Sequence, residues 1–244
     1  MNKSILESFI QKYTLGGICE KVTVKASKGT LTTTTMSENK DIVTAVDMKN
    51  TEMPDGQFSF YDTKKLSSML AVLGDDMDVV IENDPSGNPV NMMCTSGTIV
   101  LSYVLADDSI IPKALSPKSN IVYELSFEMD DALCASFIKA SSALKETSTY
   151  TIKTKGRTGT SDVLEFIIGD SSYTSNKIKF SLTLATREDP FSLKFATAPL
   201  VSVLMANKDA KKTLHICKAG LLKLECVGDS PTDYTATYYL FSVK

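Results

Sequence analysis

A stretch near the middle of the chain, Asp107–Asn120 (DDSIIPKALSPKSN), interrupts the hydrophobic pattern, which restarts in a similar form beyond it. Two prolines, a Ser-Pro step and the leading aspartates leave neither a helical nor a strand period within this stretch. The chain has 244 residues and this connector lies near its midpoint. The sequence therefore predicts two domains of ordinary size, residues 1–106 and 121–244, joined by residues 107–120.

The connector carries an apolar cluster that a solvated linker would not need. Ile110, Ile111 and Pro112 are consecutive, and Leu115 follows them closely. We therefore expect the connector to lie on the protein surface and to cover something there. A plain crossing between two domains is the alternative, because many loops do no more than connect.

The charge balance and the cysteines exclude several classes of protein. With 26 Lys and Arg against 29 Asp and Glu, the net charge is −3, so any basic surface for nucleic acid must be local. Five scattered cysteines without a C-x-x-C pair, and one histidine, His215, argue against zinc and against a disulfide framework. Reduced thiols in a cytosolic protein are expected. The amphipathic N-terminus and the lack of a long apolar run predict neither an export signal nor a membrane span.

Four segments have the period of a helix. Asn2, Asp62 and Asp130 each precede apolar residues at three- and four-residue spacing and can cap a helix. The fourth segment, Ala196–Ala206, is mainly apolar and tolerates Pro199 only in its first turn.

Most other segments are typical of antiparallel strands separated by turn residues. The expected strands are Ile18–Lys25, Gly29–Met36, Asp41–Asp47, Gln57–Tyr61, Met77–Glu82, Val90–Cys94, Thr98–Leu105, Ile121–Phe127, Thr149–Lys155, Val163–Ile168, Lys177–Leu184, Phe191–Phe195, Lys212–Cys217, Gly220–Val227 and Tyr234–Ser242.

The order of elements before the connector recurs after it, and short sequence matches fall at equivalent places. Ser8-Phe9-Ile10 in the first helix returns as Ser136-Phe137-Ile138 in the third. The apolar face of the second helix also has counterparts in the fourth. These matches predict an internal duplication, and hence an α+β fold of two similar domains, each with two helices on antiparallel sheets.

Motifs for catalysis or for metal and phosphate binding are missing from the sequence. No Walker loop, nucleophile elbow, H-E-x-x-H or EF-hand pattern occurs. Gly74-Asp75-Asp76 ends a helix and is most simply a solvated turn, and Gly156–Gly159 is typical of a turn between strands. We therefore predict no catalytic residue, metal or cofactor.

Lysines carried by the predicted helices are the main remaining signal. Any one is most simply a solvated side chain, but their recurrence near all four helices suggests a local positive surface for DNA phosphates. The candidates are Lys3, Lys12, Lys64, Lys65, Lys139, Lys145, Lys208, Lys211 and Lys212.

Three segments resemble the trimeric sliding clamps of T-even-like bacteriophages, the processivity factors of the phage DNA polymerase. They are Phe58–Asp76 (FSFYDTKKLSSMLAVLGDD), Val100–Ala106 (VLSYVLA) and Asp107–Pro112 (DDSIIP). Similar clamps have an F-x-x-x-D helix that ends in an acidic turn, and an acidic-apolar-proline stretch that opens the connector. The second half departs most, since Pro199 lies where a continuous helix is expected.

The resemblance implies a homotrimeric ring with helices inside and sheets outside, closed around duplex DNA without reading its sequence. It implies three kinds of partner, namely DNA, the DNA polymerase and an ATP-dependent clamp loader, in the cytoplasm of an infected bacterial host. Partner peptides would insert apolar anchors between the connector and the C-terminal strand. The groove would be bounded by Ile110, Ile111, Pro112, Leu115, Leu240 and Val243.

Two other functions are compatible with the sequence. Composition also allows a phage virion or tail protein of duplicated β-rich domains, although lysines on every helix and an apolar connector argue against it. The other is an enzyme whose site has no recognisable motif, which would require a pocket with two or three convergent titratable groups.

The apolar C-terminal residues could also be ordinary local packing under a loop.

Overall fold

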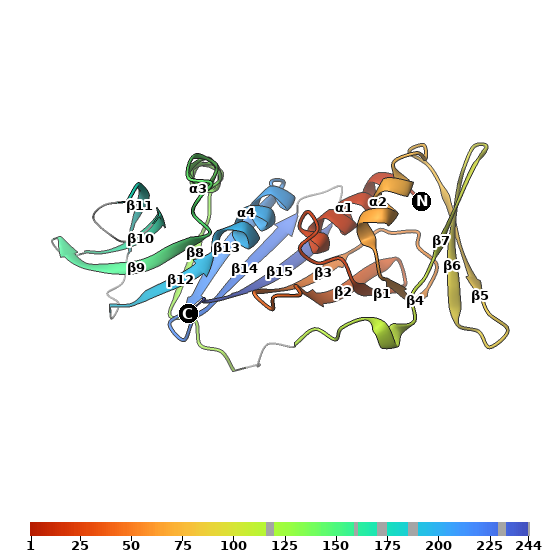
Figure 1. Ribbon diagram of the computed structural model, residues 1–244, viewed down its shortest axis with the longest axis horizontal. Helices are drawn as coiled ribbons and strands as arrows, with labels where there is room; N and C mark the ends of the chain where they lie inside the picture. The colour runs from red at the N-terminus through yellow and green to blue at the C-terminus, as the bar shows by residue number, and fades with distance from the viewer. Residues whose placement is uncertain (116–119, 159–160, 170–174, 185–189, 229–232, 244) are drawn as a thin grey trace. The chain divides into compact units, whose positions relative to one another are not determined.

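The computed structural model describes residues 1–115, 120–158, 161–169, 175–184, 190–228 and 233–243. The chain divides into two compact units. Unit 1 comprises Met1–Ser116 and Glu225–Tyr238, and unit 2 comprises Pro117–Leu224 and Tyr239–Lys244. Figure 1 labels the elements of both units in chain order.

The described residues form four α-helices, one 3-10 helix and fifteen strands. The α-helices are α1 (Lys3–Thr14), α2 (Thr63–Leu70), α3 (Asp131–Ala143) and α4 (Thr197–Ala206), and the 3-10 helix is Asp108–Ile110. The strands up to the connector are β1 (Val22–Ser27), β2 (Thr30–Met36), β3 (Ile42–Met48), β4 (Gly56–Phe60), β5 (Asp78–Asn83), β6 (Pro89–Ser96) and β7 (Ile99–Val104). The later strands are β8 (Leu125–Glu128), β9 (Thr149–Thr158), β10 (Ser161–Gly169), β11 (Lys177–Thr183), β12 (Ser192–Ala196), β13 (Ala210–Cys217), β14 (Leu221–Gly228) and β15 (Tyr234–Phe241).

The predicted helix starts are confirmed in atomic detail. The side chains of Asn2, Asp62 and Asp130 accept hydrogen bonds from main-chain N–H groups in the first turns of α1, α2 and α3. Such a cap satisfies one of the donors that the first turn leaves free. α4 has no side-chain cap, and Pro199 lies in its first turn as predicted, where a missing N–H costs nothing.

Unit 1 places its two helices together over strands of an antiparallel sheet. The strand order is β4-β1-β2-β3 followed by β15, while β5-β6-β7 form a separate three-stranded sheet. α1 contacts α2, β2 and β3, as Figure 1 also shows. The buried stripe of α1 is the one predicted, because Leu6, Phe9, Ile10 and Tyr13 are each 4% exposed or less. Burial of each such side chain contributes roughly 1.5–3 kcal/mol.

Unit 2 repeats this arrangement with its own core. Its strands follow the orders β11-β10-β9-β12 and β14-β13-β8, and α3 contacts α4. Phe137 of α3 packs edge-on against Tyr150, with ring centroids 5.1 Å apart, and against Phe166 at 6.4 Å. Phe137 and its sequence counterpart Phe9 are both 1% exposed, so the matched residues fill the same structural role.

Most boundaries lie within about three residues of the sequence-based expectation, and three differ by more. α2 ends at Leu70 rather than near Gly74, because Val72 and Leu73 donate to carbonyls three residues back and tighten the chain into turns. β1 begins at Val22, since the preceding segment turns back and the Cys19 N–H bonds the Thr14 carbonyl at 3.0 Å. β8 begins at Leu125 rather than Ile121.

Candidate functional site

The start of α2 is held by contacts that leave its two lysines in solvent. The Tyr103 hydroxyl of β7 donates to the Asp62 carbonyl at 2.9 Å, and Thr63 Oγ1 donates to the Glu20 carbonyl at 2.5 Å. Burial of the Tyr103 ring, the largest cause, raises the pKa of its hydroxyl, which therefore stays protonated and able to donate. Lys64 and Lys65 follow this anchor in the first turn of α2 and are exposed.

Lys3 is less available than the α2 lysines. Its ammonium group donates to the Leu73 carbonyl at 2.7 Å, and its side chain joins the start of α1 to the turn after α2. Lys3 would have to give up this hydrogen bond to contact a phosphate.

The prediction that Lys12 faces DNA is wrong, because the residue is only 3% exposed. Its ammonium group lies 4.0 Å from the centroid of the Tyr234 ring, which attracts it electrostatically. The α1 position that looked like a polar face in the sequence is therefore covered by β15 within unit 1.

Three of the expected lysines of unit 2 are exposed on or directly after its helices. Lys139 lies on α3, Lys145 follows that helix, and Lys208 follows α4. All three ammonium groups are therefore accessible to an anion.

The other two candidates of unit 2 occupy opposite faces of β13. Lys212 is 2% exposed, and its ammonium group donates to the Ala210 carbonyl at 2.5 Å and lies 3.4 Å from an Asp131 carboxylate oxygen. The prediction that Lys212 faces DNA is therefore also wrong, since a side chain held in this way does not face solvent. Successive side chains of a strand alternate, so the exposed Lys211 projects from the opposite face of the sheet.

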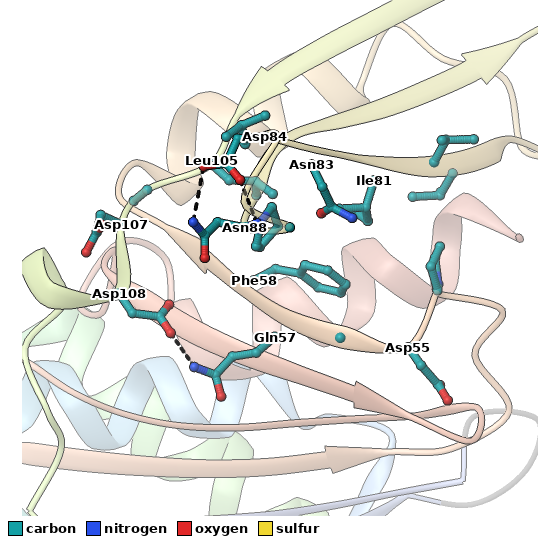
Figure 2. Close-up of a pocket in the computed structure, with 18 residues that line it drawn as sticks. Asp55, Gln57, Phe58, Ile81, Asn83, Asp84, Asn88, Leu105, Asp107 and Asp108 are labelled. Atoms are coloured by element: carbon teal, nitrogen blue, oxygen red, sulfur yellow. Dashed lines mark hydrogen bonds between the residues drawn. The ribbon is translucent and has the colours of Figure 1, made fainter.

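The connector is attached to β4 where it begins. The Ala106 N–H donates to the Ser59 carbonyl at 2.8 Å, and the Asp108 carboxylate accepts hydrogen bonds from Gln57 and Ser59. Figure 2 shows the Asp108–Gln57 contact. Asp107 caps the short 3-10 helix through Ser109, and these hydrogen bonds lower the pKa of its carboxyl.

The apolar residues of the connector differ sharply in exposure. Ile110 and Leu115 are 54% and 59% exposed and Pro112 is also exposed, whereas Ile111 is 7% exposed. The cluster therefore splits into an anchor, Ile111, and an accessible surface formed by the other three residues. Residues 116–119 of the predicted connector lie outside the described residues.

The two C-terminal residues expected at the partner groove belong to unit 2. Leu240 is 1% exposed. The prediction that it forms a wall of the partner-peptide groove is therefore wrong, because a fully packed side chain offers no surface to a ligand. Val243 is half-buried, and its N–H donates to the Lys194 carbonyl at 2.8 Å. This hydrogen bond attaches the main chain after β15 to β12 within unit 2.

Sequence reasoning missed a pocket at the root of the connector. Carboxylates that are distant in sequence line it, and Figure 2 shows Asp55, Asp84, Asp107 and Asp108 around it. The acidic pair Asp107-Asp108 next to an apolar cluster was the available sequence signal. The other two aspartates lie in separate turns, and pattern analysis cannot bring them together.

Metal-binding clusters and membrane-spanning helices are both missing from the described part of the chain. No group of three or more His, Cys, Asp or Glu side chains there could hold a metal ion. None of the helices there is both long and apolar enough to span a membrane.

Comparison with known proteins identifies the fold. No protein-family model and no curated protein matches the sequence. Among solved structures, the chain is similar to Proliferating Cellular Nuclear Antigen from Entamoeba histolytica, with a TM-score of 0.68 and 11% sequence identity. The match covers 100% of this chain and 96% of that one. The chain therefore has the DNA-clamp fold, and the predicted class, two similar domains each with two helices on antiparallel sheets, is confirmed.

Proposed function

We propose that this protein is a sliding clamp that encircles duplex DNA and tethers a replicative DNA polymerase. The observation that carries the proposal is the likeness to a clamp over the full length of both chains. A partial match would have supported only one domain. The likeness also favours a clamp over the virion or tail protein that composition allowed.

The DNA-facing surface consists of the accessible lysines on or directly after the helices. These residues are Lys64, Lys65, Lys139, Lys145 and Lys208, with Lys3 as a partly engaged sixth. On a chain of net charge −3, such local positive charge supports weak phosphate contacts that allow sliding. Sequence readout is not required, because a closed ring stays on DNA by topology.

Ring closure is proposed between strand edges, as in a homotrimer of the T-even-like phage type. β7 of unit 1 and β11 of unit 2 each lie at the end of their sheet's strand order. β7 also presents Val100 and Val104, which are 60% and 74% exposed. A head-to-tail contact between different edges closes a ring when its rotation allows, and it removes edges that invite aggregation.

The remaining parts of the proposal follow from the phage-clamp resemblance. Residues 1–106 and 121–244 would serve as the two clamp domains of each subunit, joined by residues 107–120. An ATP-dependent loader would open the ring in the cytoplasm of an infected bacterial host. The polymerase would bind through a short peptide at the connector, where Ile110, Pro112 and Leu115 are accessible.

The decisive experiment measures the native mass of the protein and its retention on circular and linear DNA. Sedimentation equilibrium at micromolar concentration should give three times 26.6 kDa or a monomer–trimer equilibrium. After loading, the protein should remain on nicked circular DNA during gel filtration and should leave when the circle is linearised. A stable two-fold dimer, or equal retention on circular and linear DNA, would contradict the proposal.

A further inference from the structure

A pocket of about 980 Å³ lies within unit 1, between β4, the β5–β6 hairpin and the root of the connector. Its volume is within the usual range of ligand sites. Figure 2 shows Phe58 on the β4 side and Ile81 on the hairpin side. Val80, which is 57% exposed, also lines the pocket and gives it accessible apolar surface.

The charged groups that line this pocket are all negative. Asp55, Asp84, Asp107 and Asp108 contribute carboxylates, and the lining contains no lysine, arginine or histidine. None of the ion pairs found among the described residues involves any of the four. Their hydrogen bonds come from neutral groups, such as the Lys28 main-chain N–H on Asp55 and the Gln57 amide on Asp108. The pocket therefore carries negative charge that no cation in its lining offsets.

Two of the carboxylates are held in the ionised form by their surroundings. Asn88 donates both its main-chain N–H and its side-chain amide to Asp84, and the main-chain bond is the first cause that lowers the pKa of that carboxyl. The Ser109 hydrogen bonds have the same effect on Asp107. Hydrogen bonds to a carboxylate favour its charged form, so Asp84 and Asp107 stay ionised to a lower pH than an ordinary aspartate.

Two strand edges border the pocket. β5 ends the order of its three-stranded sheet, and the described residues place no strand against its outer side. β4 also ends its strand order, and the isolated bridge from Ser59 to Ala106 lies on its outer side. Val79, Val80 and Ile81 all line the pocket although successive side chains alternate, so the main chain of β5 forms part of the wall. Open strand edges present unpaired N–H and C=O groups that can accept another strand.

We propose that this pocket binds an extended peptide segment of a partner protein in which apolar residues alternate with lysine or arginine. The peptide adds alongside an open strand edge, its apolar side chains contact the accessible surface of Val80 and Ile81 above the buried Phe58, and its cationic side chains meet the aspartates at the rim. This combination of main-chain pairing with pockets for alternate side chains is a general mode of peptide recognition. The inference concerns unit 1 alone and does not depend on the proposed function.

The test measures binding of a defined peptide to the full-length protein. A fluorescein-labelled decapeptide of five Lys-Val repeats is titrated at low salt, and binding is followed by anisotropy, with a Glu-Val decapeptide as the charge control. Asp55→Asn together with Asp107→Asn keeps one acceptor oxygen on each side chain, for the main-chain N–H groups of Lys28 and Ser109, but removes two charges. We expect this double variant to bind the Lys-Val peptide at least about ten-fold more weakly.

A matched variant separates the pocket from general charge attraction. Asp47→Asn with Asp75→Asn removes two exposed carboxylates of the same unit that do not line the pocket, and it should leave affinity unchanged. Methylation of alternate peptide nitrogens, which blocks strand pairing, should weaken binding by about ten-fold. The proposal is overturned if the Lys-Val peptide does not bind, if the Glu-Val peptide binds equally well, if both double variants lose affinity alike, or if N-methylation has no effect.

Discussion

The first helix and the last strand of unit 1 are joined by a buried lysine, since Lys12 Nζ lies 4.0 Å from the centroid of the Tyr234 ring. The Lys12 carbonyl also accepts a hydrogen bond from the Tyr238 hydroxyl at 2.9 Å. Both contacts are made by β15, which lies next to β3 in the sheet order. Lys12 therefore stabilises the fold rather than providing charge to a ligand.

Replacement of Lys12 should affect stability before it affects any binding. Lys12→Glu places a carboxylate against the electron-rich face of Tyr234 at a site that is 3% exposed, and we expect it to lower the free energy of unfolding by about 3 kcal/mol. Urea denaturation followed by circular dichroism measures the change. The control is Lys65→Glu on exposed α2, which should change the same quantity by less than about 0.5 kcal/mol. Equal effects of the two substitutions would show that Lys12 is not packed in this way.

The helices were predictable because their signals are local. Asn2, Asp62 and Asp130 each cap a helix within three residues of the group they bond, so the sequence alone contains the whole interaction. The fold class followed from the repeated order of such elements. The prediction that Lys12 faces DNA was wrong because its partner Tyr234 lies near the other end of the chain. Helical periodicity does not reveal what covers a polar face.

The prediction that Lys212 faces DNA was wrong for a different reason. Alternation along β13 places Lys211 and Lys212 on opposite faces, so at most one of them could project outward from a sheet covered by helices. The predicted strand began at Lys212, and alternation along it places Lys212 on the same face as the apolar Leu214 and Ile216, so the rule would have removed Lys212 from the set. For the acidic pocket the sequence offered only the Asp107-Asp108 pair, since Asp55 and Asp84 line the same pocket only after β4 and the β5–β6 hairpin are placed together.

The cysteines provide a test of the core that is independent of DNA. All five are buried, and burial raises the pKa of Cys19 to about 12 and that of Cys94 to about 11. Because the thiolate is the reactive form and a raised pKa reduces its fraction, iodoacetamide should modify the native protein slowly at mildly alkaline pH. Mass spectrometry should find five adducts in urea and few without it. A Ser68→Cys variant, with its thiol on the exposed side of α2, should gain one rapid adduct. Rapid modification of Cys19 or Cys94 in the native chain would contradict their burial.

The DNA-facing proposal predicts a specific response to charge reversal. Glutamates at Lys64, Lys65 and Lys139 should shorten retention on circular DNA and reduce its salt dependence, by about 0.9 in the log–log slope for each phosphate that is no longer neutralised. The melting temperature should stay within about 3 °C of the parent, because all three side chains are exposed. The matched control reverses Lys25, Lys28 and Lys40, three exposed lysines on a strand or in turns. If both triple variants lose retention equally, the helix-borne lysines have no special part in DNA binding.

The connector allows binding to be separated from packing residue by residue. From the sequence alone, Ile111→Ser was expected to abolish binding of the polymerase's C-terminal peptide while leaving the fold intact. At 7% exposure, Ile111 instead acts as an anchor, and its serine variant should lose about 1–3 kcal/mol of stability.

The accessible residues Ile110 and Leu115 are the better probes of a groove. Their double serine variant should melt like the parent and bind the peptide at least about ten-fold more weakly in calorimetry, because interface energy is concentrated in a few apolar anchors. Val72→Ser, which removes a comparably exposed apolar side chain after α2, serves as the control and should leave peptide affinity unchanged. Unaltered affinity in the double variant would place the polymerase contact on another surface of the chain.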